Sequence, residues 1–287
     1  LPGIPLPGVP AVGFHRVVSP AGPSLPAVGG PASPPGPSGP EWHPAAHPVP
    51  GPAGDVSLGR LPIGDRARDN RWEEARAVHA ALAEERARTL GEEHPDTLDS
   101  LHHVAFALGR LGRWEEALRG HRGVAAARGR TLGPRHPETL ASRYECAICL
   151  GRLGRPAEAL EVYRNLVADR AAAMGGEHPA TLRARHGLGV TLGRLGRWEE
   201  ALCEARNVCA LRTAVLGADH PDTLVSRREI AVALGRLGRW GPALEEYGRV
   251  RLGRERSLGP DHPDTLAARE DEARCRELAG PGLPGPV

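Results

Sequence analysis

The stretch LGRLGRWEEAL occupies residues 108–118, and the same eleven letters return at 192–202. Two close variants are LGRLGRPAEAL at 150–160 and LGRLGRWGPAL at 234–244. A second motif, HPxTL, begins at five histidines that are spaced in the same way: His94, His136, His178, His220 and His262. Every step in both series is 42 residues. A constant period over this many copies indicates an array of structural repeats.

Each unit carries the signals of two helices joined by a tight turn. In the first full unit, Pro95 suits the first turn of a helix and Asp96 suits its positive end. An apolar stripe with helical spacing follows, made of Leu98, Leu101, Val104, Ala105, Leu108 and Leu111. Gly112 supplies the left-handed stop, and Trp114 with two glutamates opens the next helix. We call these helix A and helix B, and the opening stretch is the turn between them.

Composition divides the chain into three parts. Residues 1–63 contain stretches such as PASPPGPSGP, which bury too little apolar surface to offset the entropy of ordering. We expect a disordered, partly polyproline tail there, acting as a linker or as a docking segment. The repeats occupy 64–279, and 280–287 is expected to be a second disordered tail. In the last unit Glu272 and Arg276 replace Val104 and Leu108, which indicates a polar, solubilising cap.

Charge and composition exclude several classes of protein. The net charge is only +2, far from the excess that nucleic-acid binding requires, and no apolar run is long enough to span a bilayer. Five cysteines in a chain of 287 residues do not suggest a disulfide framework, so we expect a cytoplasmic protein. The chain starts at Leu1, which predicts further sequence upstream.

The repeats resemble the tetratricopeptide repeat, whose glycine, large aromatic and alanine match Gly112, Trp114 and Ala117. The same three positions are filled at 196, 198 and 201, and at 238, 240 and 243. The 42-residue period with LGxxHPxT is similar to the kinesin-light-chain type and its bacterial relatives. The resemblance covers about residues 66–279. It implies an all-α fold, a right-handed superhelical solenoid of antiparallel helix pairs, in which helix A lines a concave groove that binds proteins and performs no catalysis.

The groove predicted by this resemblance differs from the family in one respect. The paired asparagines that grip a peptide backbone are replaced by His102–His103, Tyr144–Glu145, His186–Gly187 and Arg228–Glu229. We therefore do not expect that backbone clamp here.

Aligning the units by helix phase predicts three rows of side chains along the groove. The first row is apolar and holds Phe106, Ile148, Val190 and Val232. The second holds His102, Tyr144, His186 and Arg228. The third is an arginine ladder of Arg110, Arg152, Arg194 and Arg236. Arginine suits carboxylates, so we expect an extended or helical partner with apolar and acidic side chains, or a free carboxyl terminus. The alternative is that these arginines complement helix C-termini and solvate the surface.

Other recurring residues are interpreted as structural. The HPxTL histidines stand one per turn and cannot converge on a metal ion, so we assign them to helix starts. Cys146 and Cys149 have CxxC spacing but occupy core positions of a helix A. One position near the end of helix B is always arginine (Arg86, Arg128, Arg170, Arg212 and Arg254), which predicts a salt bridge between repeats or a complement to the helix dipole. The tryptophans are expected to wedge between helices A and B, and Pro156 predicts a weaker place where that wedge is missing.

The sequence therefore predicts a non-enzymatic scaffold or adaptor that binds a protein or peptide. We expect no cofactor, no metal, no nucleic acid, no membrane and no small-molecule substrate. The alternative function is the sensor region of a larger bacterial signalling ATPase or transcriptional regulator whose effector domain lies upstream. The phosphate-binding motif GxxxxGK[ST] is impossible within this chain, which has no lysine.

Overall fold

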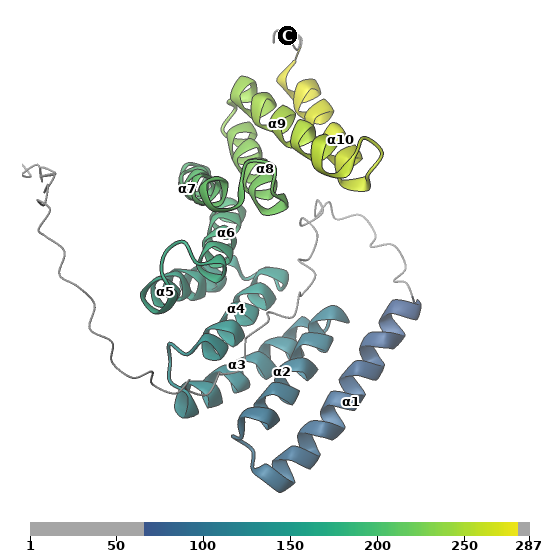
Figure 1. The fold of residues 1–287 in the computed structure, drawn as a ribbon, viewed down its shortest axis with the longest axis vertical. Helices are drawn as coiled ribbons and strands as arrows, with labels where there is room; N and C mark the ends of the chain where they lie inside the picture. The colour runs from purple at the N-terminus through teal and green to yellow at the C-terminus, as the bar shows by residue number, and fades with distance from the viewer. Residues whose placement is uncertain (1–65, 281–287) are drawn as a thin grey trace, which may run out of the picture. The chain divides into compact units, whose positions relative to one another are not determined.

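The computed structural model of the protein describes residues 66–280, and all regular structure within that range is helical (Figure 1). The helices are α1 (Arg66–Leu90), α2 (Pro95–Arg110), α3 (Trp114–Thr131), α4 (Pro137–Arg152), α5 (Pro156–Met174), α6 (Pro179–Arg194), α7 (Trp198–Leu216), α8 (Pro221–Arg236), α9 (Trp240–Leu258) and α10 (Pro263–Ala279). The predicted tails, over 1–63 and 280–287, lie outside the described residues apart from Gly280.

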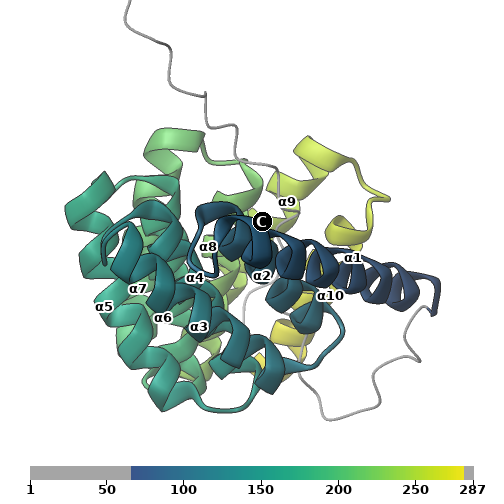
Figure 2. The same ribbon diagram turned by 90° about the horizontal axis from the view of Figure 1, so that it is seen from below.

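The helices pack in chain order, each against the next, and α2, α4, α6 and α8 also contact one another in sequence (Figures 1 and 2). The even-numbered helices are of the A type and the odd-numbered helices are of the B type. Every described helix A begins at the proline of HPxTL, and α3, α7 and α9 begin at their tryptophans. The predicted solenoid of antiparallel helix pairs is therefore confirmed. The first helix, α1, is a helix B that starts ahead of Trp72 and runs through it.

The HPxTL motif forms the start of each helix A. The Nδ1 atom of each histidine accepts a hydrogen bond from the backbone N–H two residues later, at 3.1–3.3 Å in all five copies. The threonine hydroxyl donates to the carbonyl of the glycine that ends the preceding helix, as Thr97 does to Gly91 at 2.8 Å. That glycine has a φ of 102°, which favours glycine. The assignment of these histidines to helix starts is confirmed. The hydroxyl of Thr223 is the exception and is buried without a partner.

The tryptophans lie between the two helices of a repeat, as predicted. A Cβ atom added to Gly109 of α2 would stand 3.2 Å from the ring of Trp114, and one added to Gly193 would stand 2.8 Å from the ring of Trp198. Helix A thus needs glycine at this position because the indole occupies the space of a side chain. A turn glycine, Gly112 with a φ of 76°, then reverses the chain between the helices.

The predicted apolar stripe of α2 is wrong at one position, Leu101. Leu98, Ala105 and Leu108 are buried, but Leu101 is exposed. Its position lies at the solvent-facing rim between helices A and B, where other repeats have arginine. Arg185, for example, donates from Nε to Glu204 of helix B at 2.6 Å. In the repeat of Leu101, the position equivalent to Glu204 is Gly120 of α3. Because glycine has no side chain, nothing at this position covers Leu101.

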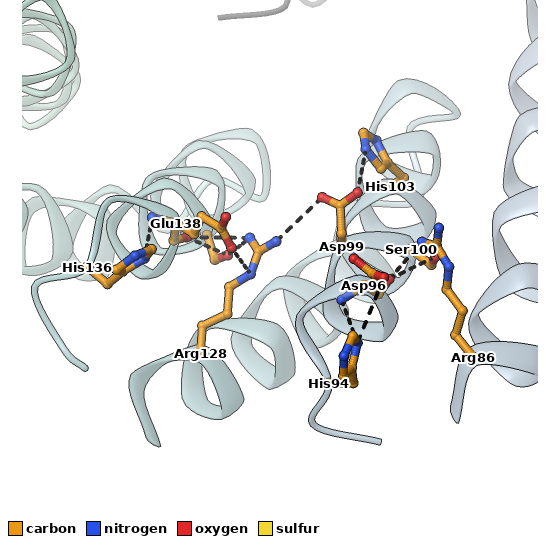
Figure 3. A network of polar contacts seen from close by, with 10 residues as sticks. Arg86, His94, Asp96, Asp99, Ser100, His103, Arg128, His136 and Glu138 are labelled. Carbon is orange, nitrogen blue, oxygen red and sulfur yellow. Dashed lines mark hydrogen bonds and ion pairs between the residues drawn. The ribbon is translucent and has the colours of Figure 1, made fainter. Parts of the chain in front are cut away.

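A recurring arginine joins each helix B to the next helix A. Its Nη1 atom donates to a backbone carbonyl in the first turn of the following helix, at 2.6–3.5 Å in all five copies. Where a serine stands one turn later, the same atom donates to its hydroxyl, as from Arg128 to Ser142 at 3.0 Å. Figure 3 shows Arg128 reaching from α3 toward Glu138 of α4 and Asp99 of α2. Arg128 forms an ion pair between repeats with Glu138, as predicted, but the contact shared by all five copies is the hydrogen bond to the backbone carbonyl. Four of the five arginines are buried.

The cysteines of the CxxC stretch belong to the core, as predicted. Cys146 and Cys149 pack in one cluster with Leu140, Leu150 and Leu166. Burial raises the pKa of both thiols to about 12, so the reactive thiolate is disfavoured at neutral pH.

The buried arginines give the first testable prediction. Arg212→Met should lower the free energy of unfolding by roughly 3 kcal/mol, because the carbonyl of Asp222 and the hydroxyl of Ser226 lose a charged donor. The matched control is Arg206→Met on the same helix, which is exposed and should change stability by about 0.5 kcal/mol or less. Urea unfolding followed by circular dichroism measures both. Equal effects of the two variants would contradict the role of Arg212.

Candidate partner-binding face

The three predicted rows of side chains stand one helical turn apart on each helix A, as His102, Phe106 and Arg110 do on α2. The apolar row (Phe106, Ile148, Val190 and Val232) is partly exposed in every repeat, so it is accessible without being fully solvated. Phe106 also meets the ring of Trp72 edge-on, with 5.9 Å between ring centroids. Part of the apolar surface of this row therefore remains exposed to solvent.

Most side chains of the second row contact side chains of neighbouring helices. The ring of His102 meets that of His121 on α3 at 5.0 Å, and the ring of Tyr144 meets that of Tyr163 on α5 at 6.0 Å. Arg228 instead donates from Nε to Asp271 of α10 at 2.7 Å. His121 and Tyr163 stand 42 residues apart, so the period alone could have identified them as equivalent ring partners.

The arginine ladder lies over the tryptophans of the preceding repeats. The guanidinium carbons of Arg110, Arg152 and Arg236 stand 5.2, 5.6 and 5.6 Å from the ring centroids of Trp72, Trp114 and Trp198. These distances are within the range of cation–π attraction. All four arginines of the ladder remain exposed. The sequence assigned all four to one face but did not indicate that three of them lie over the ring of a tryptophan one repeat behind.

Arg194 differs because the repeat that precedes it lacks the tryptophan. The preceding helix B begins at Pro156, and Arg194 donates from Nη1 to the carbonyl of Gly151 at 2.8 Å. A Cβ atom added to Gly151 would stand 2.9 Å from that nitrogen. The guanidinium thus lies against the glycine that receives an indole ring in the other repeats.

Two carboxylates of this face were not predicted as site residues. Desolvation raises the pKa of Glu145 to about 7, although Arg170 and Arg183 oppose the shift. Desolvation also raises the pKa of Glu229, against the opposing charges of Arg228 and Arg194. Both residues stand in the second position of the asparagine pair, which is the signal that could have singled them out.

Burial lowers the pKa of two histidines of this face, His102 and His186, and of His121 on the adjoining α3. Desolvation lowers the pKa of His102 to about 3, with the charges of His121 and Arg128 adding to the effect. Desolvation also lowers the pKa of His121 to about 4 and that of His186 to about 4. The Nδ1 atoms of His79, His102 and His121 are buried without a hydrogen-bond partner.

Within residues 66–280, no group of three or more histidine, cysteine, aspartate or glutamate side chains is placed to hold a metal ion. Over the same range, no helix has the length and hydropathy needed to cross a membrane.

Comparisons with known proteins agree with this architecture. Models of the tetratricopeptide repeat family match residues 100–172, 181–222 and 223–264. A putative kinesin light chain from Podosopora anserina, described as having nearly identical TPR-like repeats, is 30% identical with a TM-score of 0.58. That match covers 67% of this chain and 92% of the other. A variant of the same protein gives a TM-score of 0.59 with the same identity and coverage.

A second solved structure shares the fold at lower identity. BtubC (BKLC) from P. vanneervenii is 17% identical, with a TM-score of 0.62, over 72% of this chain and 84% of that one. No curated protein sequence matches this chain.

The neutral histidines predict acid sensitivity. Because their folded-state pKa values are lowered, the unfolded chain binds more protons below about pH 6.5, and stability should fall as the pH decreases toward 4. His102→Tyr with His186→Tyr, which copies Tyr144 of the second repeat, should make this dependence shallower. Urea unfolding at a series of pH values measures it. An equally steep dependence in wild type and variant would contradict this explanation.

The missing tryptophan predicts a local weakness that can be repaired. Amide exchange in residues 140–170 should be faster than in the equivalent parts of other repeats. Pro156→Trp should slow it and raise the free energy of unfolding by about 1 kcal/mol, because Arg194 gains a ring to stack on. Hydrogen exchange by mass spectrometry measures both effects. Uniformly slow exchange in the wild type, or no response to the substitution, would show that Arg194 already compensates for the missing ring.

Proposed function

The chain belongs to the tetratricopeptide repeat family, whose repeats indicate a protein-interaction scaffold, and we propose that it is a non-enzymatic scaffold that holds a segment of a partner protein along its A helices. The observation that carries this proposal is the accessible apolar row from Phe106 to Val232, edged in every complete repeat by an exposed arginine. A segment lying along α2, α4, α6 and α8 would meet the same pair of features four times.

The arginine ladder supports a partner with acidic side chains. An arginine held over an indole by cation–π attraction keeps N–H groups for hydrogen bonds, and this attraction restricts its orientation in advance. The planar fork then suits a carboxylate in two-point contact. The partner we propose is a segment in which apolar residues alternate with acidic ones, or one that ends in a free carboxylate.

The second row of side chains supports a groove that recognises its partner through side chains. The ring pairs and the Arg228–Asp271 ion pair occupy the positions at which a backbone clamp would be expected. Recognition is therefore assigned to the apolar row and to the ladder.

Peptide display on the full chain tests this function. Selected peptides should be enriched in apolar and acidic residues, and the affinity of a selected peptide should fall at least tenfold in the variant Arg152→Glu with Arg194→Glu. It should also fall with added salt. The control is Arg119→Glu with Arg206→Glu, which makes the same charge change on exposed positions of α3 and α7. Equal affinity in both variants would remove the ladder from the proposal, and failure to select any peptide would contradict groove binding.

A further inference from the structure

The described helices begin and end with half a repeat. The first, α1, is a helix B with Trp72 at the position of Trp114, and the last, α10, is a helix A with the same HPDTL start as α2. Within residues 66–280, α1 therefore has no helix A of its own and α10 has no helix B. These two helices stand at opposite ends of the order of packing.

Positions that are buried in complete repeats are exposed at both ends. Leu266 of α10 is 43% exposed, whereas the equivalent Leu98, Leu140, Leu182 and Leu224 are at most 3% exposed. Leu82 of α1 is 37% exposed, whereas the equivalent Val124, Leu166, Val208 and Val250 are at most 2% exposed. In the α2/α3 and α4/α5 repeats these two positions belong to the same cluster, Leu98 with Val124 and Leu140 with Leu166. The exposed face of α10 is thus the face that a helix B would cover, and the exposed face of α1 is the face that a helix A would cover.

The repeat of α4 and α5 shows how closely the two ends correspond. On helix A, Leu140, Arg143 and Ala147 of α4 are matched by Leu266, Arg269 and Ala273 of α10. On helix B, Val162, Leu166 and Asp169 of α5 are matched by Val78, Leu82 and Glu85 of α1. The chemical type of the side chain is the same at all six positions.

The charges of the two ends are complementary as well. In the α4/α5 repeat, Arg143 donates from Nη1 to Asp169 at 2.7 Å. The matching residues at the ends, Arg269 and Glu85, again carry opposite charges. Arg269 is engaged with Glu255 of α9 at 2.5 Å in the single chain and remains partly exposed, so it can be shared.

We propose that α10 of one copy of this chain takes α1 of a second copy as its missing helix B. The junction is a repeat assembled from two chains, in which Leu82 packs against Leu266 and Glu85 pairs with Arg269. Each copy offers one end of each kind, so the contact is head-to-tail and the association is open-ended. The proposal concerns self-association and does not depend on the function proposed for the groove.

The half of the junction near the A–B turn is polar. We expect this to weaken the association of the two copies. Arg276 and Glu277 stand where the α4/α5 repeat has Leu150 and Gly151, and Arg76 stands where it has Leu160. Because helix A needs glycine beside an indole, Glu277 prevents Trp72 of the second copy from seating as Trp114 does. The junction therefore rests on its other half, around Leu82 and Leu266. We expect it to be weaker than the packing within one chain and to form in a concentration-dependent way.

Sedimentation velocity of the full chain over a wide range of concentrations tests the proposal. The average mass should rise steadily with concentration and should not stop at a dimer. Leu82→Glu and Leu266→Glu should each be monomeric, because each removes one of the two complementary surfaces. Mixing the two variants should produce a one-to-one dimer, because Leu82→Glu retains its α10 end and Leu266→Glu retains its α1 end.

The control is Val215→Glu, which changes an exposed apolar residue of α7 and should associate like the wild type. Circular dichroism checks that each variant is folded, as expected for substitutions at exposed positions. A wild-type chain that stays monomeric at every concentration would overturn the proposal. So would a dimer that survives one of the two leucine substitutions, since that points to a symmetric contact, or a mixture of the two variants that stays monomeric.

Discussion

Each repeat of this protein depends on a buried arginine whose partners belong to the next repeat. Arg212 is enclosed near the end of α7, where desolvation lowers its pKa, and it donates to Asp222 and Ser226 at the start of α8. A buried guanidinium without acceptors is costly, so helix B is stable in this position only when the following helix A is present. The same constraint recurs at the buried Arg128, Arg170 and Arg254, and the partly exposed Arg86 makes the equivalent hydrogen bond. It makes the hairpins mutually dependent and fixes the distance from one to the next.

A second link between repeats lies on the opposite end of helix A. The indoles of Trp114 and Trp198 each occupy the space beside a glycine of their own helix A, and an arginine of the following repeat lies over each ring. These two tryptophans therefore contribute both to their own hairpin and to the next. The exposed arginine that we assign to partner binding is held in place by this packing. The same arginines therefore contribute to partner binding and to stability. A substitution in the ladder changes both, and a matched variant is needed to separate the two effects.

Departures from the repeat pattern are accommodated by the neighbouring repeat. Arg194 contacts the glycine left uncovered by Pro156. Tyr163 is accommodated because the next helix A carries Gly187, at which a Cβ atom would stand 2.5 Å from the ring. Side chains that differ along the array are thus matched in pairs across repeat boundaries. The same principle connects the two ends, where the exposed faces of α1 and α10 correspond to the buried faces of α5 and α4.

The sequence by itself determined the period, the hairpins, the histidines at the helix starts, the turn glycines, the core cysteines and the recurrence of one arginine near the end of each helix B. These follow from local signals and from a repeat length that places equivalent residues in equivalent surroundings. The tertiary structure decided which side chains from adjacent repeats meet. The stacking of Arg152 on Trp114, the pairing of His102 with His121, the exposure of Leu101 and the raised pKa of Glu145 belong to this second group. Spacing along the chain sets the face of a helix on which a residue lies. The side chains opposite that residue, and the water they exclude, are set by how neighbouring helices pack.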